Sequence, residues 1–487
     1  MINRNLSMCC PHNPINFGLL ATILLTGLSA CGGGSSDSGE GYFKIYNAST
    51  NAPDIYLTIE DSDEIEKRYS GIGYGESAGY YSYSPDTYSV ELAWQDGDNS
   101  YDAIVYQDNL KVSDEEVQLV VVTGDINQPN VLTFQYQDED PDDDEDQFTL
   151  RFLNVHQSAE AVDVYMSKED ETFNEAVLVG AYSYGELSPS HYFDIDNYKF
   201  YLTSAGSTEV LYESEEIAYS YTTQYIMVIR ENIGPGDSPF TLDKLSKSTS
   251  TVTYPDEDSG AEYRVYNGLI PHELMPSYSG FFDLYIDSID DSPEVAALAQ
   301  GEFSESISMP FGDYSLDLTN AGESSAFAKN HLLSLSPNSD KTVFFYTTEE
   351  TEDDDGDDNI EEETTLYVNH LVTDNNNQIS LYNHQVKIIN LIQDDDFGGV
   401  TVAFVRSNET IDTAANSLYN TRLTPMSVSL LNNTYDVYIV AEVDDSDLIL
   451  AATQITLSED SGNLFLVLEQ DPVSSTGYKL TFAAQSE

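Results

Sequence analysis

Short segments that alternate hydrophobic and polar residues recur four times along this chain of 487 residues. In each segment every second residue is apolar and an asparagine closes the run, which is the pattern of a half-buried strand. A basic residue occupies the same outward position in all four, although the chain has only 18 Lys and Arg. Successive asparagines are separated by roughly 105 to 125 residues, which is the size of one β-sandwich domain. The segments are Phe43-Lys44-Ile45-Tyr46-Asn47, Leu150-Arg151-Phe152-Leu153-Asn154, Tyr263-Arg264-Val265-Tyr266-Asn267 and Val386-Lys387-Ile388-Ile389-Asn390.

A second alternating strand follows each asparagine. Its apolar residues share one face, and its Asp and Tyr point the other way. These outward residues could form a row that faces a ligand; we interpret them as surface residues of the strand. The copies are Asp54-Ile55-Tyr56-Leu57, Asp163-Val164-Tyr165-Met166, Asp283-Leu284-Tyr285-Ile286 and the divergent Thr401-Val402-Ala403-Phe404.

A tyrosine directly after a polar turn is the third shared feature. It opens a later strand in every copy, as Tyr88, Tyr198, Tyr314 and Tyr435. This placement resembles the tyrosine corner of immunoglobulin-like sandwiches, in which the ring packs in the core and the hydroxyl bonds nearby backbone. We assign the asparagines a structural role as well, because an Asn amide can bind the backbone of the loop that follows it.

No stretch shows a sustained helical period with capping residues. The pattern therefore predicts an all-β fold of four tandem immunoglobulin-like β-sandwich domains. Like-charge repulsion should stretch the first acidic linker. The expected parts are a first repeat at 41–137, an acidic linker at 138–146, a second repeat at 147–253, a linker at 254–260, a third repeat at 261–383 and a divergent fourth repeat at 384–487.

The N-terminus has the layout of a secretory signal. Arg4 precedes an apolar stretch from Phe17 to Leu28 that is too short to cross a bilayer as a mature helix. The ending Leu28-Ser29-Ala30-Cys31 resembles the lipobox of bacterial lipoproteins, which implies cleavage before Cys31 and lipidation of its sulfur. The alternative is an ordinary signal peptide with a chance cysteine. The four sandwich domains would thus follow a lipoprotein signal peptide at 1–30 and a lipidated Cys with a flexible linker at 31–40. A glycine after the cysteine, here Gly32, resembles the sequence of lipoproteins that are sorted to the outer membrane. We therefore expect a lipid-anchored protein of that membrane, facing either side.

The charge of the chain excludes one class of partner. Asp and Glu number 86, and the formal net charge is −68. Lys and Arg are too scarce to form a phosphate-binding stripe, so we expect no nucleic acid partner. Most acids should form a solvated surface. One acidic loop follows the spacing of calcium loops, and its candidate ligands are Asp353, Asp355, Asp357 and Glu362; the alternative is a solvated hairpin loop.

The openings of the repeats resemble a family of bacterial extracytoplasmic domains of unknown function, whose consensus begins V-N-A-S-x-x-A-P-x-V-D-V-Y. Residues 47–56 and 154–165 are the nearest matches, the third copy carries an insertion, and the fourth lacks both Asp and Tyr. The resemblance implies tandem immunoglobulin-like sandwiches on cell-envelope lipoproteins. It brings no catalytic residue.

No catalytic constellation is recognisable. His156, Ser158 and Asp163 lie close in sequence, but no nucleophile elbow or glycine-rich oxyanion loop accompanies them. We therefore predict no enzyme and no cofactor, with Ca²⁺ as the one possible ion. The expected function is that of a non-enzymatic, lipid-anchored cell-envelope protein whose repeats form an interaction or spacer module. Its partners would be the membrane, through Cys31, and an unknown protein or glycan. The alternative is a calcium-dependent adhesin or glycan-binding surface lipoprotein.

Overall fold

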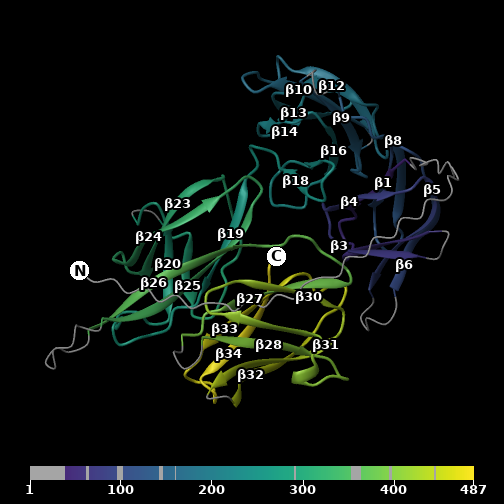
Figure 1. Cartoon of the computed structure of the whole chain (residues 1–487). Coiled ribbons are helices and arrows are strands. Elements are labelled where there is room, and N and C mark those ends of the chain that lie inside the picture. The colour runs from purple at the N-terminus through teal and green to yellow at the C-terminus, as the bar shows by residue number, and fades with distance from the viewer. Residues whose placement is uncertain are drawn as a thin grey trace, which may run out of the picture. The chain divides into compact units, whose positions relative to one another are not determined.

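The computed structural model describes residues 39–61, 65–95, 102–141, 146–159, 161–289, 292–352, 363–393, 398–443 and 446–486. In these ranges the chain is built from strands, and the only helical element among them is a short 3-10 turn, η2 (Ile411–Thr413). The predicted all-β sandwich class is confirmed (Figure 1). Residues 39–487 form one compact unit, so the division into four separate domains stays a prediction.

The first two repeats contain eighteen strands between them, counted over the described ranges. The first repeat holds β1 (Gly41–Ala48), β2 (Ile55–Glu60), β3 (Glu66–Ile72), β4 (Ser77–Tyr83), β5 (Asp86–Gln95), β6 (Asp102–Val112), β7 (Glu116–Thr123) and β8 (Asn130–Gln137). The second holds β9 (Gln147–Asn154), β10 (Ala161–Lys168), β11 (Val177–Ser183), β12 (His191–Asp194), β13 (Asn197–Ser204), β14 (Val210–Glu213), β15 (Ile217–Ala218), β16 (Gln224–Glu231), β17 (Phe240–Leu245) and β18 (Thr251–Tyr254).

The last two repeats contain eight strands each in the described part of the chain. The third holds β19 (Ala261–Asn267), β20 (Phe281–Ile286), β21 (Val295–Ala299), β22 (Ile307–Met309), β23 (Gly312–Asn320), β24 (Ala326–Leu335), β25 (Asp340–Glu352) and β26 (Glu363–Asp374). The fourth holds β27 (Asn383–Asn390), β28 (Gly399–Val405), β29 (Asn416–Thr421), β30 (Met426–Leu431), β31 (Thr434–Val443), β32 (Ser446–Thr456), β33 (Leu464–Gln470) and β34 (Tyr478–Ala484).

All four repeats share one strand order. In the first, one sheet runs β4-β1-β7-β8 and the other β3-β2-β5-β6, and the third and fourth repeats follow the same order. The second repeat extends the equivalent sheets with β18 and β15. The opening strand pairs in parallel with a late strand in every copy, as β1 does with β7. This strand order differs from that of a constant immunoglobulin domain, in which strands A, B, E and D form one sheet and strands C, F and G form the other.

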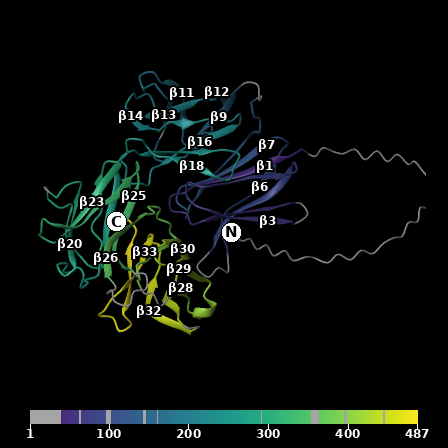
Figure 2. The same ribbon diagram turned by 60° about the vertical axis from the view of Figure 1, so that its left-hand side comes forward.

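Each repeat encloses a hydrophobic core between its two sheets. In the first, Phe43 and Ile45 of β1 meet Leu57 of β2 and Val90 of β5, all of which are at most 1% exposed. Equivalent clusters fill the second, third and fourth repeats. Figure 2 shows two such sheets in the third repeat, with β20 and β23 in one and β25 and β26 in the other. Period-two alternation thus places the apolar residues of the opening strands inside.

Candidate functional site: the faces that join the repeats and the cleft between them

The asparagine that ends each opening strand is buried and holds the next loop. Its side-chain oxygen accepts a hydrogen bond from the backbone N–H two residues later, at 3.0 or 3.1 Å in every copy. Its amide nitrogen donates to a backbone carbonyl about thirty residues on, at 2.8 to 3.5 Å. Each asparagine thus ties the backbone just after the opening strand to a carbonyl of a neighbouring edge strand, so the asparagines act on the fold. The four are Asn47, Asn154, Asn267 and Asn390.

The tyrosine that opens the later strand repeats its contact in the same way. Its hydroxyl donates to the backbone carbonyl four residues earlier, at 2.7 to 2.9 Å, in all four copies. Three of the rings are buried, and the ring of Tyr314 is half-buried. The contact fixes the corner at which the chain passes from one sheet to the other. The residues are Tyr88, Tyr198, Tyr314 and Tyr435.

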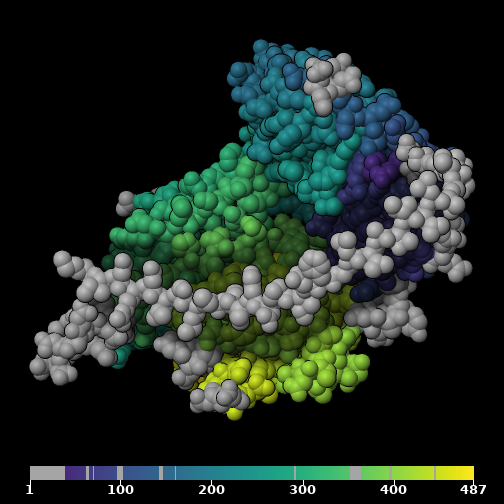
Figure 3. Space-filling view, in the orientation of Figure 1, coloured from purple at the N-terminus to yellow at the C-terminus, as the bar shows by residue number. Residues whose placement is uncertain are grey.

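The opposite face of each opening strand is buried too, against another repeat. Tyr46 of β1 and Leu119 of β7 form one hydrophobic cluster with Leu153 of β9 and Val228 of β16. A second cluster joins the third and fourth repeats through Tyr266, Phe344, Ile389, Leu391, Phe465 and Val467. Figure 3 shows the surfaces of these two repeats, green and yellow-green, in direct contact. The structure thus joins the repeats in pairs, the first with the second and the third with the fourth.

The basic residues at the shared outward position lie at these junctions. Lys44 is 1% exposed and donates from Nζ to the carbonyls of Ser246 and Ser248 in the second repeat, at 2.9 Å each. Because no carboxylate offsets its burial, desolvation lowers the pKa of Lys44 to about 8. The other three also reach the partner repeat. Arg151 lies over the ring of Tyr136, Arg264 lies over Phe465 and donates to the Ala484 carbonyl, and Lys387 donates to Thr373 and Asp374.

A buried tyrosine–carboxylate contact fixes the first pair of repeats. The hydroxyl of Tyr46 donates to Asp243 Oδ2 at 2.5 Å, and both side chains are fully buried. Arg230 donates to both carboxylate oxygens of Asp243, at 2.6 and 3.3 Å. Burial and the neighbouring Asp243 raise the pKa of Tyr46 well above its ordinary value, so the hydroxyl stays protonated.

The second pair of repeats contains the same contact with other residues. The hydroxyl of Tyr266, which stands where Tyr46 does, donates to Glu469 Oε1 at 2.6 Å. Lys479 is the cation here, with Nζ 2.9 Å from the same oxygen. Register places Arg230 and Glu469 at equivalent positions, since Ile229 pairs with Asn154 and Leu468 with Asn390. The acid and the base have therefore exchanged strands between the two pairs.

The linkers are held in place as well. Lys247 of the second repeat lies 2.8 Å from Asp138 and 2.7 Å from Asp140, so a cation bridges the seam that we expected repulsion to stretch. The second and third repeats meet where the side-chain amides of Asn232 and Asn338 exchange two hydrogen bonds, at 2.8 and 3.2 Å.

The segment between the third and fourth repeats packs on the first. The side chain of Gln378 donates to the carbonyl of Ala52 at 2.9 Å, and the N–H of Leu381 donates to the carbonyl of Asn51 at 3.1 Å. The ring of Tyr382 stacks on Trp94, with ring centroids 4.0 Å apart and planes inclined by 19°. Trp94 is the only tryptophan of the chain, and its contact links the first repeat to the fourth through this segment.

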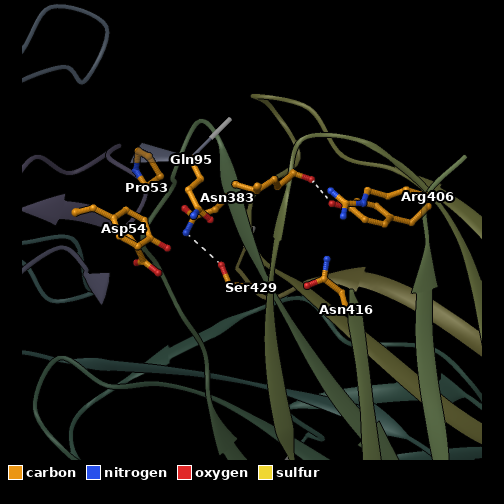
Figure 4. Close-up of a pocket in the computed structure, with 10 residues that line it drawn as sticks. Pro53, Asp54, Gln95, Asn383, Arg406, Asn416 and Ser429 are labelled. Carbon is orange, nitrogen blue, oxygen red and sulfur yellow. Dashed lines mark hydrogen bonds between the residues drawn. The ribbon is translucent and has the colours of Figure 1, made fainter. Parts of the chain in front are cut away.

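A polar cleft lies beside that contact, and we call it the closure cleft. It has two adjoining parts, of about 150 Å³ and about 290 Å³, which share Asp54, Asn383 and Ser429. In Figure 4 the amide of Asn383 bonds Ser429, at 3.1 Å, and Asn416 projects between Ser429 and Arg406. The first part is lined by Pro53, Asp54, Tyr56, Gln95, Asn383, Arg406, Asn416, Ser429, Leu431 and Tyr435, and the second by Asp54, Asn376, Gln378, Ser380, Asn383, Gln385, Ser427, Val428, Ser429 and Asn463.

Two charged side chains line the cleft. Burial, and to a smaller extent the charge of Glu76, raises the pKa of Asp54 above its ordinary value, while a hydrogen bond to Asn383 opposes that rise. Arg406 forms an ion pair with Glu409 at 2.7 Å, and both side chains are largely buried. The guanidinium charge is therefore already balanced by Glu409.

Several predicted features lie outside the described residues. These are the signal peptide, Cys31 and the calcium candidates Asp353, Asp355, Asp357 and Glu362. Within the described ranges, no three His, Cys, Asp or Glu side chains gather as metal ligands. In the same ranges no helix has the length and hydropathy that a membrane crossing requires.

Sequence reasoning missed the residues that join the repeats. Nothing in the sequence marks Asp243 or Glu469. Alternation predicts outward positions for Tyr46 and Tyr266, and likewise for Asp163 and Asp283. The last two are in fact buried and accept hydrogen bonds at 2.7 Å from the N–H groups of Gly206 and Gly322. One available signal was the basic residue repeated at the same outward position in a chain poor in cations.

The comparisons with known proteins identify one domain. Residues 41–165 match a domain of unknown function, DUF4397. The match spans the first repeat and extends through β9 into β10 of the second. Among curated proteins, none matches this chain significantly.

Three solved structures show how distant the structural likeness is. The Bacillus anthracis TIE protein is 9% identical, with 85% of this chain and 68% of that chain covered and a TM-score of 0.14. The major pilin subunit of Bacillus cereus is 11% identical, with coverage of 66% and 99% and a TM-score of 0.14. A Bacteroides fragilis protein described as a cell adhesion candidate is 8% identical, with coverage of 92% and 98% and a TM-score of 0.16. Likeness at this level supports no statement about function.

Proposed function

We propose that this chain is a non-enzymatic protein of the cell envelope, held at the outer membrane by lipid on Cys31. Its β-sandwich repeats act as a spacer and interaction module that keeps surface loops in fixed relation to one another. The observation that carries the proposal is the burial of polar contacts between repeats, Tyr46 with Asp243 and Tyr266 with Glu469. Such contacts serve a rigid assembly of repeats, because a buried polar group is costly unless its partner stays in place.

The side chains closest to a hydrolytic triad serve the backbone instead. His156 Nε2 lies 3.2 Å from the Pro239 carbonyl oxygen, and Asp163 accepts the N–H of Gly206. These contacts favour a structural role for both residues. Specific turnover of an ester, peptide or glycoside substrate by the purified chain, lost on changing His156 or one carboxylate, would contradict the proposal.

The anchor is tested by palmitate labelling and membrane fractionation in a Gram-negative host. Cys31→Ser should abolish labelling and release the protein from the outer-membrane fraction. Cys10→Ser is the matched control, since the proposed cleavage removes Cys10, and it should leave both unchanged. Labelling that survives Cys31→Ser, or that Cys10→Ser abolishes, would refute lipidation at Cys31.

A further inference from the structure

We propose that the closure cleft binds a short neutral saccharide. Ligand pockets in proteins usually measure about 300 to 1,000 Å³, and the larger part of this cleft, about 290 Å³, adjoins a second part of about 150 Å³. The inference deepens the proposed interaction role and rests on it in one respect: the cleft exists only while the first and fourth repeats stay together.

The lining matches sugar hydroxyl groups. Side-chain amides and hydroxyls predominate, among them those of Gln95, Asn383, Asn416 and Ser429. An amide both donates and accepts hydrogen bonds, as a sugar hydroxyl does. Apolar drug-like ligands need predominantly hydrophobic walls, which this cleft lacks.

Asp54 departs from its counterparts in a way that favours a ligand. The equivalent Asp163 and Asp283 accept backbone N–H bonds from Gly206 and Gly322 within their own repeats. Asp54 instead lines both parts of the cleft beside Asn383. The carboxylate of Asp54 is half-buried and hydrogen-bonded to Asn383, and it is a strong acceptor whose remaining lone pairs a pair of sugar hydroxyls can use.

The charges disfavour other ligand classes. The one cation of the cleft, Arg406, is paired with Glu409, so an anionic ligand finds no free counter-charge and meets a chain of net charge −68. A divalent cation needs several oxygen ligands, and the described residues gather no three acids or histidines for one. A neutral polyhydroxylated ligand needs neither a free counter-charge nor a set of acidic ligands.

The cleft contains its own spectroscopic reporter. Trp94 stacks on Tyr382 and directly precedes Gln95, which lines the cleft. As the chain has no other tryptophan, a change in tryptophan emission on ligand addition arises beside the cleft.

The test is a titration of the full chain in a zwitterionic detergent without a sugar head group. The probes are cellotriose, maltotriose, mannotriose and chitotriose, with trigalacturonate as the anionic comparison. Trp94 emission and calorimetric heat are both recorded. At least one neutral trisaccharide should bind with a Kd between about 10 μM and about 1 mM. Raising the NaCl concentration should leave that Kd unchanged, because no ion pair forms.

Two cleft variants and one control locate the binding. Asn416→Leu and Gln95→Leu should each weaken binding about tenfold, the loss expected for a hydrogen bond inside a site. Asn408→Leu, on an exposed residue outside the cleft, should keep the Kd within about twofold. Thermal unfolding of each variant verifies that it is folded.

Three results would overturn the proposal. The first is the absence of both heat and emission change with every neutral trisaccharide up to about 10 mM. The second is equal affinity in the cleft variants and the control variant. The third is binding of trigalacturonate that is tighter than binding of the neutral trisaccharides. Each would leave the spacer role standing, because that role is judged by anchoring, by the absence of turnover and by unfolding in pairs.

Discussion

Replacing Tyr46 with Phe tests the junction of the first two repeats, because the substitution removes one hydroxyl group and leaves the ring in place. The hydroxyl is fully buried and donates to a fully buried carboxylate. A hydrogen bond to a charged group contributes about 1.5 to 3 kcal/mol. Because Arg230 keeps its two bonds to Asp243 in the variant, the carboxylate is not left unpaired. We therefore expect Tyr46→Phe to lower the free energy of unfolding by about 2 kcal/mol.

The assay is calorimetric and chemical unfolding of the full chain at pH 7. A loss of about 2 kcal/mol corresponds to a fall in Tm of about 4 to 8 °C for a unit of two repeats. Tyr266→Phe should cost a similar amount in the other pair, through Glu469. The two losses should add, since distant sites without shared partners are independent. Tyr221→Phe is the control, because this tyrosine is 73% exposed.

The pH dependence gives a second readout of Tyr46. In the unfolded chain tyrosine loses its proton near pH 10, whereas burial raises the pKa of Tyr46 far above that value in the folded chain. Above pH 10 the folded state binds the extra proton, so stability falls with rising pH in the wild type more steeply than in Tyr46→Phe. A loss no larger than that of Tyr221→Phe, together with parallel pH profiles, would refute a buried Tyr46–Asp243 bond.

Three further substitutions probe buried polar groups. Burial lowers the pKa of Lys44 to about 8. Between about pH 8 and pH 10 the unfolded chain therefore holds a proton that the folded chain has released. Across that window, chemical unfolding should show the wild type gaining stability relative to Lys44→Met. Burial raises the pKa of Asp340 to about 6, so its stabilising contribution is present below about pH 4 and is lost as the pH rises through 6. Asp340→Asn should therefore raise Tm by a few degrees at pH 7 and leave it unchanged at pH 4. Equal shifts of Tm at both pH values would contradict this. Asn154→Ala removes two buried hydrogen bonds and should cost about 2 to 4 kcal/mol in urea unfolding, while the exposed Asn174→Ala should change stability by less than about 0.5 kcal/mol.

The β-sandwich fold could be predicted from local sequence patterns, because the alternation within each strand indicates which side chains face the core. Phe43 and Ile45 alternate with polar neighbours, and both are buried between the sheets of the first repeat. The turn before Tyr88 is likewise visible in sequence, since its polar residues and the tyrosine lie side by side.

The covering of the other face could not be predicted in this way. Alternation says that Lys44 and Tyr46 point away from Phe43, and solvent is the ordinary expectation for that side. Their partners Ser246 and Asp243 lie about two hundred residues away, and a period-two pattern holds no information about contacts at that distance. The closure cleft could not be predicted for the same reason, because it depends on contacts such as that of Gln378 with Ala52, which lie 326 residues apart in the sequence.

Native-state hydrogen exchange on the full chain tests the pairing of repeats most directly. We expect the slowest amides of β7 in the first repeat and β16 in the second to open with the same free energy and the same denaturant dependence. The slowest amides of β25 and β33 should form a second such set, and Tyr46→Phe should lower the first set alone. If β7 instead opened several kcal/mol below β16, with Tyr46→Phe affecting only β7, the repeats would be separate units and the account would be wrong.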